Sequence, residues 1–271
     1  MAARPVRTRR FDLRKTLFVL PNLITLSSIF CGFDSMRLAA SAKSDADYFA
    51  AALLLVFAMF FDMLDGRVAR MTRTQSAFGL QIDSLADVVS FGAAPALLVY
   101  QWSLHSLGDW GLAASFIFLA CGAVRLARFN VLSMGEQGKP TRPSKFIVGL
   151  PIPGAAGILI SIVVTDHAVA GDLGAPRYAL PVLVVTMALS FLMVSTIKFR
   201  SFKDIRLNGR TLGFVSFMVA SSVLISTQLK PAFVLVWLLG MYVALAVFET
   251  FVGMVARRSR RQQRNSVPPA A

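Results

Sequence analysis

The sequence contains little cysteine, histidine or acidic charge. Its 271 residues include two cysteines and two histidines, and 14 acidic residues stand against 28 lysines and arginines. Cys31 and Cys121 both lie inside apolar runs, and we expect them to be small buried apolar side chains. They therefore say little about the redox compartment of the protein. His105 and His167 lie on the side of the membrane that the pattern of basic residues predicts to be the outer one, far from the cluster of aspartates at residues 62–87. A histidine-based mechanism is therefore not expected.

The chain also lacks any linker long enough to separate two folded domains. We expect a basic N-terminal arm over residues 1–16, one transmembrane domain over 17–256, and a basic, disordered tail over 257–271. No cleavable signal peptide is expected, because the first apolar run is long and no small-residue cleavage site follows it.

Apolar residues dominate the remainder. They make up 56% of the chain, above the roughly 45–50% of soluble domains. Runs of about 20 apolar residues recur, each long enough to cross a bilayer as a helix. The sequence therefore predicts an all-α polytopic membrane protein. Its eight predicted spans cover residues 18–40, 47–64, 83–101, 111–131, 146–165, 178–197, 212–228 and 232–255.

The basic residues test this assignment of membrane spans, because lysine and arginine gather in the short loops on the cytoplasmic side of a membrane protein. Alternate connections, the arm and the tail are rich in arginine and lysine, which predicts that both termini are cytoplasmic. The connections on the other side hold only Lys43, Arg177 and Lys230, alongside five aspartates. The net charge of +14 is then explained by topology and by attraction to anionic lipid headgroups, without nucleic acid.

Four of the 14 acidic residues stand close together, in the segment FDMLDGRVARMTRTQSAFGLQIDSLAD (61–87). Asp62 and Asp65 are three residues apart, and Asp83 and Asp87 are four apart, so each pair shares one face of a helix. A basic turn over residues 70–78 joins the two predicted helices at the cytoplasmic surface. The two carboxylate faces can then meet across a small gap, which the small residues Gly66, Ala69 and Gly79 leave open to a ligand or to backbone.

Four carboxylates in one low-dielectric pocket repel one another unless cations neutralise them. Hard divalent ions such as Mg²⁺, Mn²⁺ or Ca²⁺ prefer oxygen ligands of this type, whereas zinc favours cysteine and histidine. Aspartates from two helices are able to bridge two ions and leave ligand positions open for phosphate oxygens. The planar guanidinium of Arg70 suits phosphate as well.

Intramembrane aspartates also occur in proton and ion pathways, so a cation-coupled transporter is an alternative. A non-enzymatic membrane scaffold is another alternative, but such a protein has no need of buried carboxylates. The full pattern favours phosphate chemistry, because it fixes eight positions over 26 residues. It reads D-x2-D-G-x2-A-R-x8-G-x3-D-x3-D, from Asp62 to Asp87.

These eight positions resemble the signature of the CDP-alcohol phosphatidyltransferase family without departure. Members of that family transfer a phosphatidyl group from a CDP-linked lipid to an alcohol and release CMP. The resemblance implies that Asp62, Asp65, Asp83 and Asp87 hold two divalent ions, Mg²⁺ or Mn²⁺. It implies that Asp87 is the general base, with Asp83 the other catalytic aspartate. It also implies a CDP-lipid site at Asp62, Gly66, Ala69, Arg70 and Gly79, and a homodimer.

Further stretches resemble one subgroup, the bacterial integral-membrane phosphatidylserine synthases. They are PNLITLSSIFCGF (21–33), DSLADVVSFGAAPALL (83–98), RLARFN (125–130) and GLPIPGAAG (149–157). The expected reaction is transfer from CDP-diacylglycerol to L-serine at the cytoplasmic face of the bacterial inner membrane. Acceptance of glycerol-3-phosphate, inositol or choline by the same metal site stays open.

Four polar residues in these stretches are candidates for substrate contacts. Asn22 follows Pro21 near the predicted start of the first span, where its amide either binds the CDP-lipid or caps the helix. Arg125, Arg128 and Asn130 end the fourth span. They either bind the acceptor carboxylate or lipid phosphate, or they are ordinary basic and polar residues whose side chains reach the interface.

Overall fold

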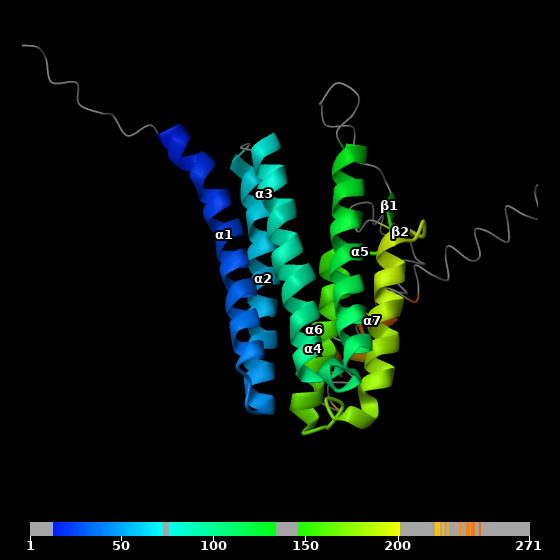
Figure 1. Ribbon diagram of the computed structural model, residues 1–271. Helices are drawn as coiled ribbons and strands as arrows, with labels where there is room; N and C mark the ends of the chain where they lie inside the picture. Colours follow the sequence, from blue (N-terminus) through cyan, green and yellow to red (C-terminus); the bar gives the residue numbers. More distant parts are fainter. Residues whose placement is uncertain are drawn as a thin grey trace, which may run out of the picture.

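A computed structural model of the chain describes residues 13–72, 76–133 and 146–200, together with scattered positions between 220 and 244. Long helices lie side by side in a bundle (Figure 1). In chain order they are α1 (Leu13–Ala40), α2 (Asp45–Thr72), α3 (Ala77–Asp87), α4 (Ala94–Trp102), α5 (Asp109–Ser133), α6 (Ile152–Val169) and α7 (Ala179–Val194). A π-helical segment, η1 (Val88–Ala93), joins α3 to α4 into one continuous rod.

Six helical segments in the described part are long and apolar enough to cross a membrane. They are Leu20–Ala40, Asp45–Thr72, Phe78–Trp102, Asp109–Leu132, Ile152–Val169 and Pro176–Val194. These six correspond to the first six predicted spans. The predicted spans at 212–228 and 232–255, and the tail, lie largely or wholly outside the described residues. Large apolar side chains on the outer surface, such as Phe30 and Phe33 on α1 and Phe57 on α2, suit contact with lipid tails.

The first helices differ from their predicted boundaries. Helix α1 begins at Leu13, four residues before the predicted start of the transmembrane domain, and Pro21 lies within it and not at its start. A proline inside a helix has no N–H to bond to the carbonyl four residues earlier, so one helical hydrogen bond is missing there. Helix α2 continues to Thr72 and α3 begins at Ala77, so the connection is shorter than the predicted turn over 70–78.

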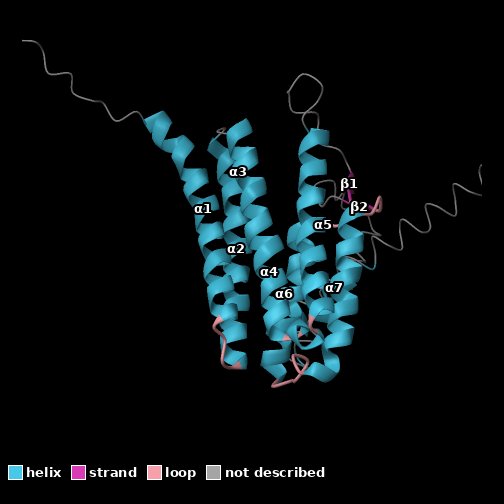
Figure 2. Cartoon of the chain, viewed as in Figure 1, coloured by secondary structure: helices cyan, strands magenta, loops and turns pink. Residues whose placement is uncertain are grey.

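The described residues also contain a small pair of strands that an all-α prediction did not include. Residues 146–148, expected to open the fifth span, form strand β1 (Phe146–Val148), which pairs antiparallel with β2 (Lys198–Arg200). Figure 2 shows these strands near the end of the bundle where α5 ends. Helix α6 begins only at Ile152, because Gly149 adopts a positive φ of 79° and Pro151 disfavours a helical conformation at the residue before it, Leu150.

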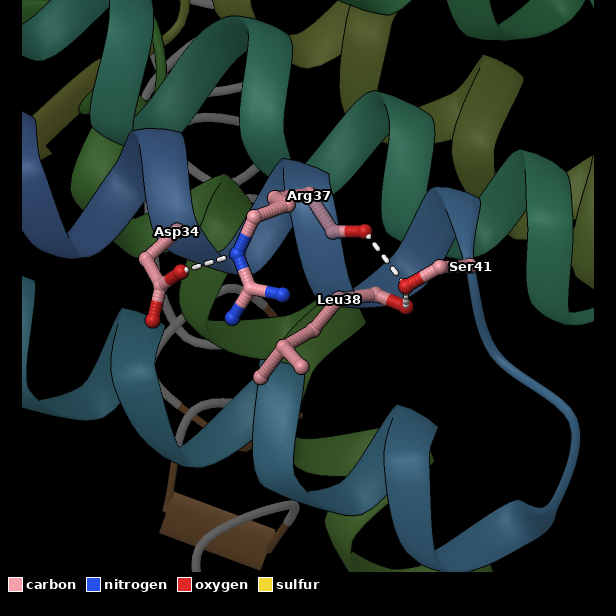
Figure 3. A network of polar contacts seen from close by, with 4 residues as sticks. All are labelled: Asp34, Arg37, Leu38 and Ser41. Atoms are coloured by element: carbon pink, nitrogen blue, oxygen red, sulfur yellow. Dashed lines mark hydrogen bonds and ion pairs between the residues drawn. The ribbon is translucent and has the colours of Figure 1, made fainter.

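The connections between α1 and α2 and between α6 and α7 lie at the opposite end of the bundle from β1 and β2 (Figure 2). The end of α1 at this side is held by local polar contacts (Figure 3). Arg37 Nε donates to Asp34 Oδ1 at 2.6 Å, and the Ser41 hydroxyl donates to the Arg37 carbonyl at 2.9 Å. Asp34 balances the charge of Arg37, but an exposed ion pair of this kind adds little stability.

The core between α1, α2 and the α3–η1–α4 rod is built largely from small residues. Ala51, Ala52 and Ala58 of α2 are fully buried. A Cβ on Gly32 of α1 would lie only 2.9 Å from the Ser90 Cα of η1, so α1 and the π-helical segment approach at backbone distance. This close packing holds the last turn of α3, which carries Asp87, against the first two helices.

Candidate metal and phosphate site

The structure brings the two predicted carboxylate faces together, and three of the four aspartates form one compact group. Asp62 and Asp65 lie on α2, and Asp83 lies on α3. One carboxylate oxygen from each lies within 4.8 Å of the others. Asp65 is only 4% exposed, whereas Asp62 and Asp83 are half-buried. Three converging carboxylates in an apolar bundle form an oxygen donor set that suits a hard divalent cation.

Asp87 lies one turn beyond Asp83, in the last turn of α3. Its carboxylate lies near those of Asp62 and Asp83 and near the Arg125 guanidinium. Its Oδ1 is buried and accepts no hydrogen bond from any residue that the structure describes. A buried carboxylate oxygen without a hydrogen-bond donor, next to other carboxylates, is available to bind a metal ion or to accept a proton from a substrate.

Of the two glycines in the motif, Gly66 leaves open space beside Arg70, whereas a Cβ on Gly79 would lie 3.2 Å from the Ser76 hydroxyl. A Cβ on Gly66 would meet only Arg70, with the nearest guanidinium nitrogen 3.7 Å away. Arg70 is exposed, and Ala69 beside it is half-buried. At the start of α3 the Ser76 hydroxyl accepts a hydrogen bond of 3.0 Å from the Gly79 backbone N–H, which caps the helix. The open space at Gly66 next to the Arg70 guanidinium suits a phosphate group.

Sequence reasoning did not identify Thr25, which the structure brings to the cluster from α1. Its hydroxyl lies 2.6 Å from Asp65 Oδ2, and both side chains are buried. The available signal was a polar residue inside an apolar span, three positions after the candidate Asn22. That signal is weak alone, because threonine also occurs in membrane helices with its hydroxyl bonded to its own backbone.

Asn22 lies on the same helix, about one turn before Thr25, and its side chain is half-buried. Because α1 already runs through this position, Asn22 does not cap the start of a helix, and that alternative is excluded. Its role in binding the CDP-lipid stays a prediction.

Asn130 lies beside the aspartate cluster. Its side-chain nitrogen Nδ2 donates a hydrogen bond of 2.9 Å to the hydroxyl of Ser84, the residue that follows Asp83 on α3. Arg125, on the same helix as Asn130, is 7% exposed and lies near the Asp87 carboxylate. The end of α5 therefore contributes an amide and a guanidinium next to the carboxylates.

Arg128 is engaged differently. Its guanidinium donates to the backbone carbonyls of Val194, Val148 and Ser195 at 3.0, 3.2 and 3.3 Å. These bonds tie the end of α5 to the end of α7 and to β1. The contacts identify Arg128 as a link between elements in this structure, and its predicted role in acceptor binding stays a prediction.

Replacing Arg128 with alanine is expected to destabilise the protein by on the order of 2 kcal/mol, because three carbonyls lose a charged donor. Thermal unfolding in detergent measures this. Arg177→Ala, which removes an exposed ion pair with Asp172, is the control and is expected to change stability little. Unchanged stability in Arg128→Ala, combined with a raised KM for the acceptor, would instead support the acceptor-binding role.

Comparison with known proteins finds similarity over most of the chain. The family model described as CDP-alcohol phosphatidyltransferase matches residues 18–248. A protein of Helicobacter pylori named CDP-diacylglycerol–serine O-phosphatidyltransferase is 40% identical over 195 residues, which cover 71% of this chain and 76% of the relative. A protein of Bacillus subtilis with the same name is 34% identical over 185 residues, covering 68% and 91%. A third, from Methanocaldococcus jannaschii, is 36% identical over 150 residues, covering 55% and 62%.

Proposed function

The chain belongs to the CDP-alcohol phosphatidyltransferase family, and we propose that it transfers the phosphatidyl group of CDP-diacylglycerol to the hydroxyl of L-serine. The products are phosphatidylserine and CMP. The observation that carries the proposal is the convergence of Asp62, Asp65 and Asp83, in a chain whose relatives carry the name of this serine enzyme. The chain is an integral membrane protein, with six apolar helices in its described part.

The donor set fits divalent ions, and we propose that Asp62, Asp65, Asp83 and Asp87 hold two of them, Mg²⁺ or Mn²⁺. When bound, such ions polarise the pyrophosphate and neutralise charge on the departing CMP. Arg70, exposed beside the open space at Gly66, would bind a phosphate oxygen of the CDP-lipid. The nucleotide would pack near Gly66, Ala69 and Gly79, with Asn22 contributing its amide.

Asp87 would accept the proton of the serine hydroxyl as that oxygen attacks the lipid-side phosphorus. A serine hydroxyl is a weak nucleophile at neutral pH and needs such a base. Attack forms the new P–O bond while the bond from phosphorus to the CMP oxygen breaks. Arg125 and Asn130, which lie toward the end of α5 beside Asp87 and Asp83, are the groups we propose to hold the serine.

We further propose that the site faces the cytoplasm of a bacterial inner membrane. In the described structure, Arg67 and Arg70 of α2 and Arg125 and Arg128 of α5 lie toward the end of the bundle that carries the site. The concentration of arginine at one end supports this orientation through the positive-inside rule.

A homodimer, which the family resemblance implies, is part of the proposal and is testable by crosslinking in membranes.

The test is an acceptor panel. Purified protein in detergent receives CDP-diacylglycerol, Mn²⁺ or Mg²⁺, and one of serine, glycerol-3-phosphate, inositol or choline, while CMP release and lipid product are followed. We expect release with serine alone and its loss in Asp83→Asn. Release with another alcohol would keep the site but change the acceptor. Absence of release with every alcohol, together with ion flux, would support the transporter.

A further inference from the structure

Thr25 brings a hydroxyl from α1 to the aspartate cluster of α2 and α3. Its Oγ1 lies 2.6 Å from Asp65 Oδ2 and 3.0 Å from the Pro21 carbonyl oxygen. Thr25 is 5% exposed and Asp65 is 4% exposed. The contact is therefore shielded from water and joins two helices.

A threonine hydroxyl carries one hydrogen, so the two acceptors compete for it. In a helix the hydroxyl commonly donates to the carbonyl four residues earlier, which here belongs to Pro21. That carbonyl is also the normal acceptor of the Thr25 backbone N–H. The Asp65 carboxylate is nearer and carries charge, which makes it the stronger acceptor. The hydrogen is therefore directed to Asp65.

We propose that Thr25 is a positioning residue for the metal site. Its hydrogen bond fixes the orientation of the Asp65 carboxylate toward Asp62 and Asp83, and so raises the affinity of the cluster for a divalent ion. Mutation of a residue that hydrogen-bonds to a metal ligand, without binding the metal itself, typically lowers metal affinity or activity by roughly 10–100-fold. The proposal rests on the proposed function, because it assumes that the cluster binds metal.

The next buried polar residue of α1 shows why Thr25 is distinct. Ser28 is 1% exposed, and its hydroxyl contacts the Ala58 carbonyl at 3.2 Å and the Ser90 hydroxyl at 3.3 Å. The Ser90 hydroxyl in turn donates to the Ser28 carbonyl at 3.0 Å. These bonds hold α1, α2 and η1 together without contacting an aspartate. Thr25 instead places its hydroxyl on a carboxylate.

The experiment compares Mn²⁺ binding by purified full-length protein in detergent, without substrate, using the electron paramagnetic resonance signal of free Mn²⁺. Thr25→Val removes the donor at nearly constant volume and is expected to weaken binding by about 10-fold or more. Thr25→Ser keeps the donor and is expected to bind like the wild type. Thr186→Val is the matched control, because Thr186 is also buried and its hydroxyl donates to a carbonyl four residues earlier, at 2.9 Å.

Wild-type Mn²⁺ affinity in folded Thr25→Val would overturn the positioning role and leave the proposed function intact. Loss of affinity in Thr25→Ser as great as in Thr25→Val would also overturn it, because the hydroxyl would then not be the cause. Should Thr25→Val fail to fold, Thr25→Cys takes its place with the same expectation, since a thiol is a weak donor. Absence of Mn²⁺ binding by the wild type would overturn the metal site itself.

Discussion

Replacing Asp62 with asparagine is expected to lower the rate of CMP release by at least about three orders of magnitude. Asp62 belongs to the three-carboxylate group and also lies near the Asp87 carboxylate, so its charge is central to the whole cluster. Electrostatic stabilisation by a bound ion is worth several kcal/mol, and about 1.36 kcal/mol corresponds to a tenfold change in rate. An asparagine of the same size keeps the shape and removes the charge.

The measurement is CMP release at saturating CDP-diacylglycerol and serine, over a range of Mn²⁺ concentrations. Asp109→Asn is the control, because Asp109 is exposed at the start of α5, at the opposite end of the bundle. It is expected to leave the rate unchanged. A chelator added to the wild type is expected to reproduce the Asp62→Asn defect, and excess Mn²⁺ is expected to reverse the effect of the chelator. A rate for Asp62→Asn close to that of the wild type would contradict the metal site.

The placement of the aspartates could be predicted because helical spacing is a local property. Asp62 and Asp65 share a face of α2, and Gly79 and Asp83 share a face of α3, as their spacing requires. The short connection between the two helices then leaves little freedom in how they meet. The structure brings one oxygen each from Asp62, Asp65 and Asp83 within 4.8 Å.

Contacts between distant segments could not be predicted in this way. Thr25 reaches Asp65 only because α1 has a particular rotation against α2, and no periodicity in one helix specifies that rotation. The pairing of β1 with β2 likewise depends on residues far apart in the chain. The three carbonyls that bind Arg128 come from the ends of other elements, so its contacts were equally invisible in the sequence.

Replacing Asp87 with asparagine is expected to keep CDP-lipid binding but lower turnover by about 10²–10⁴-fold, the usual contribution of a general base. Asp87 lies outside the three-carboxylate group, one turn beyond Asp83, and its buried Oδ1 accepts no hydrogen bond from the described residues. An amide in this position cannot accept the serine proton. Asp87→Glu retains a carboxylate at a displaced position and is expected to recover part of the rate.

Binding and turnover are measured separately for this prediction. Thermal stabilisation by CDP-diacylglycerol reports binding, and CMP release at saturating serine reports turnover, with Asp109→Asn again the control. A base acting in the chemical step predicts a lower kcat with little change in lipid affinity. Equal loss of lipid affinity and turnover would instead assign Asp87 to metal and substrate binding. Unchanged turnover would exclude Asp87 as the base, because the asparagine that replaces it has no basic oxygen to take the proton.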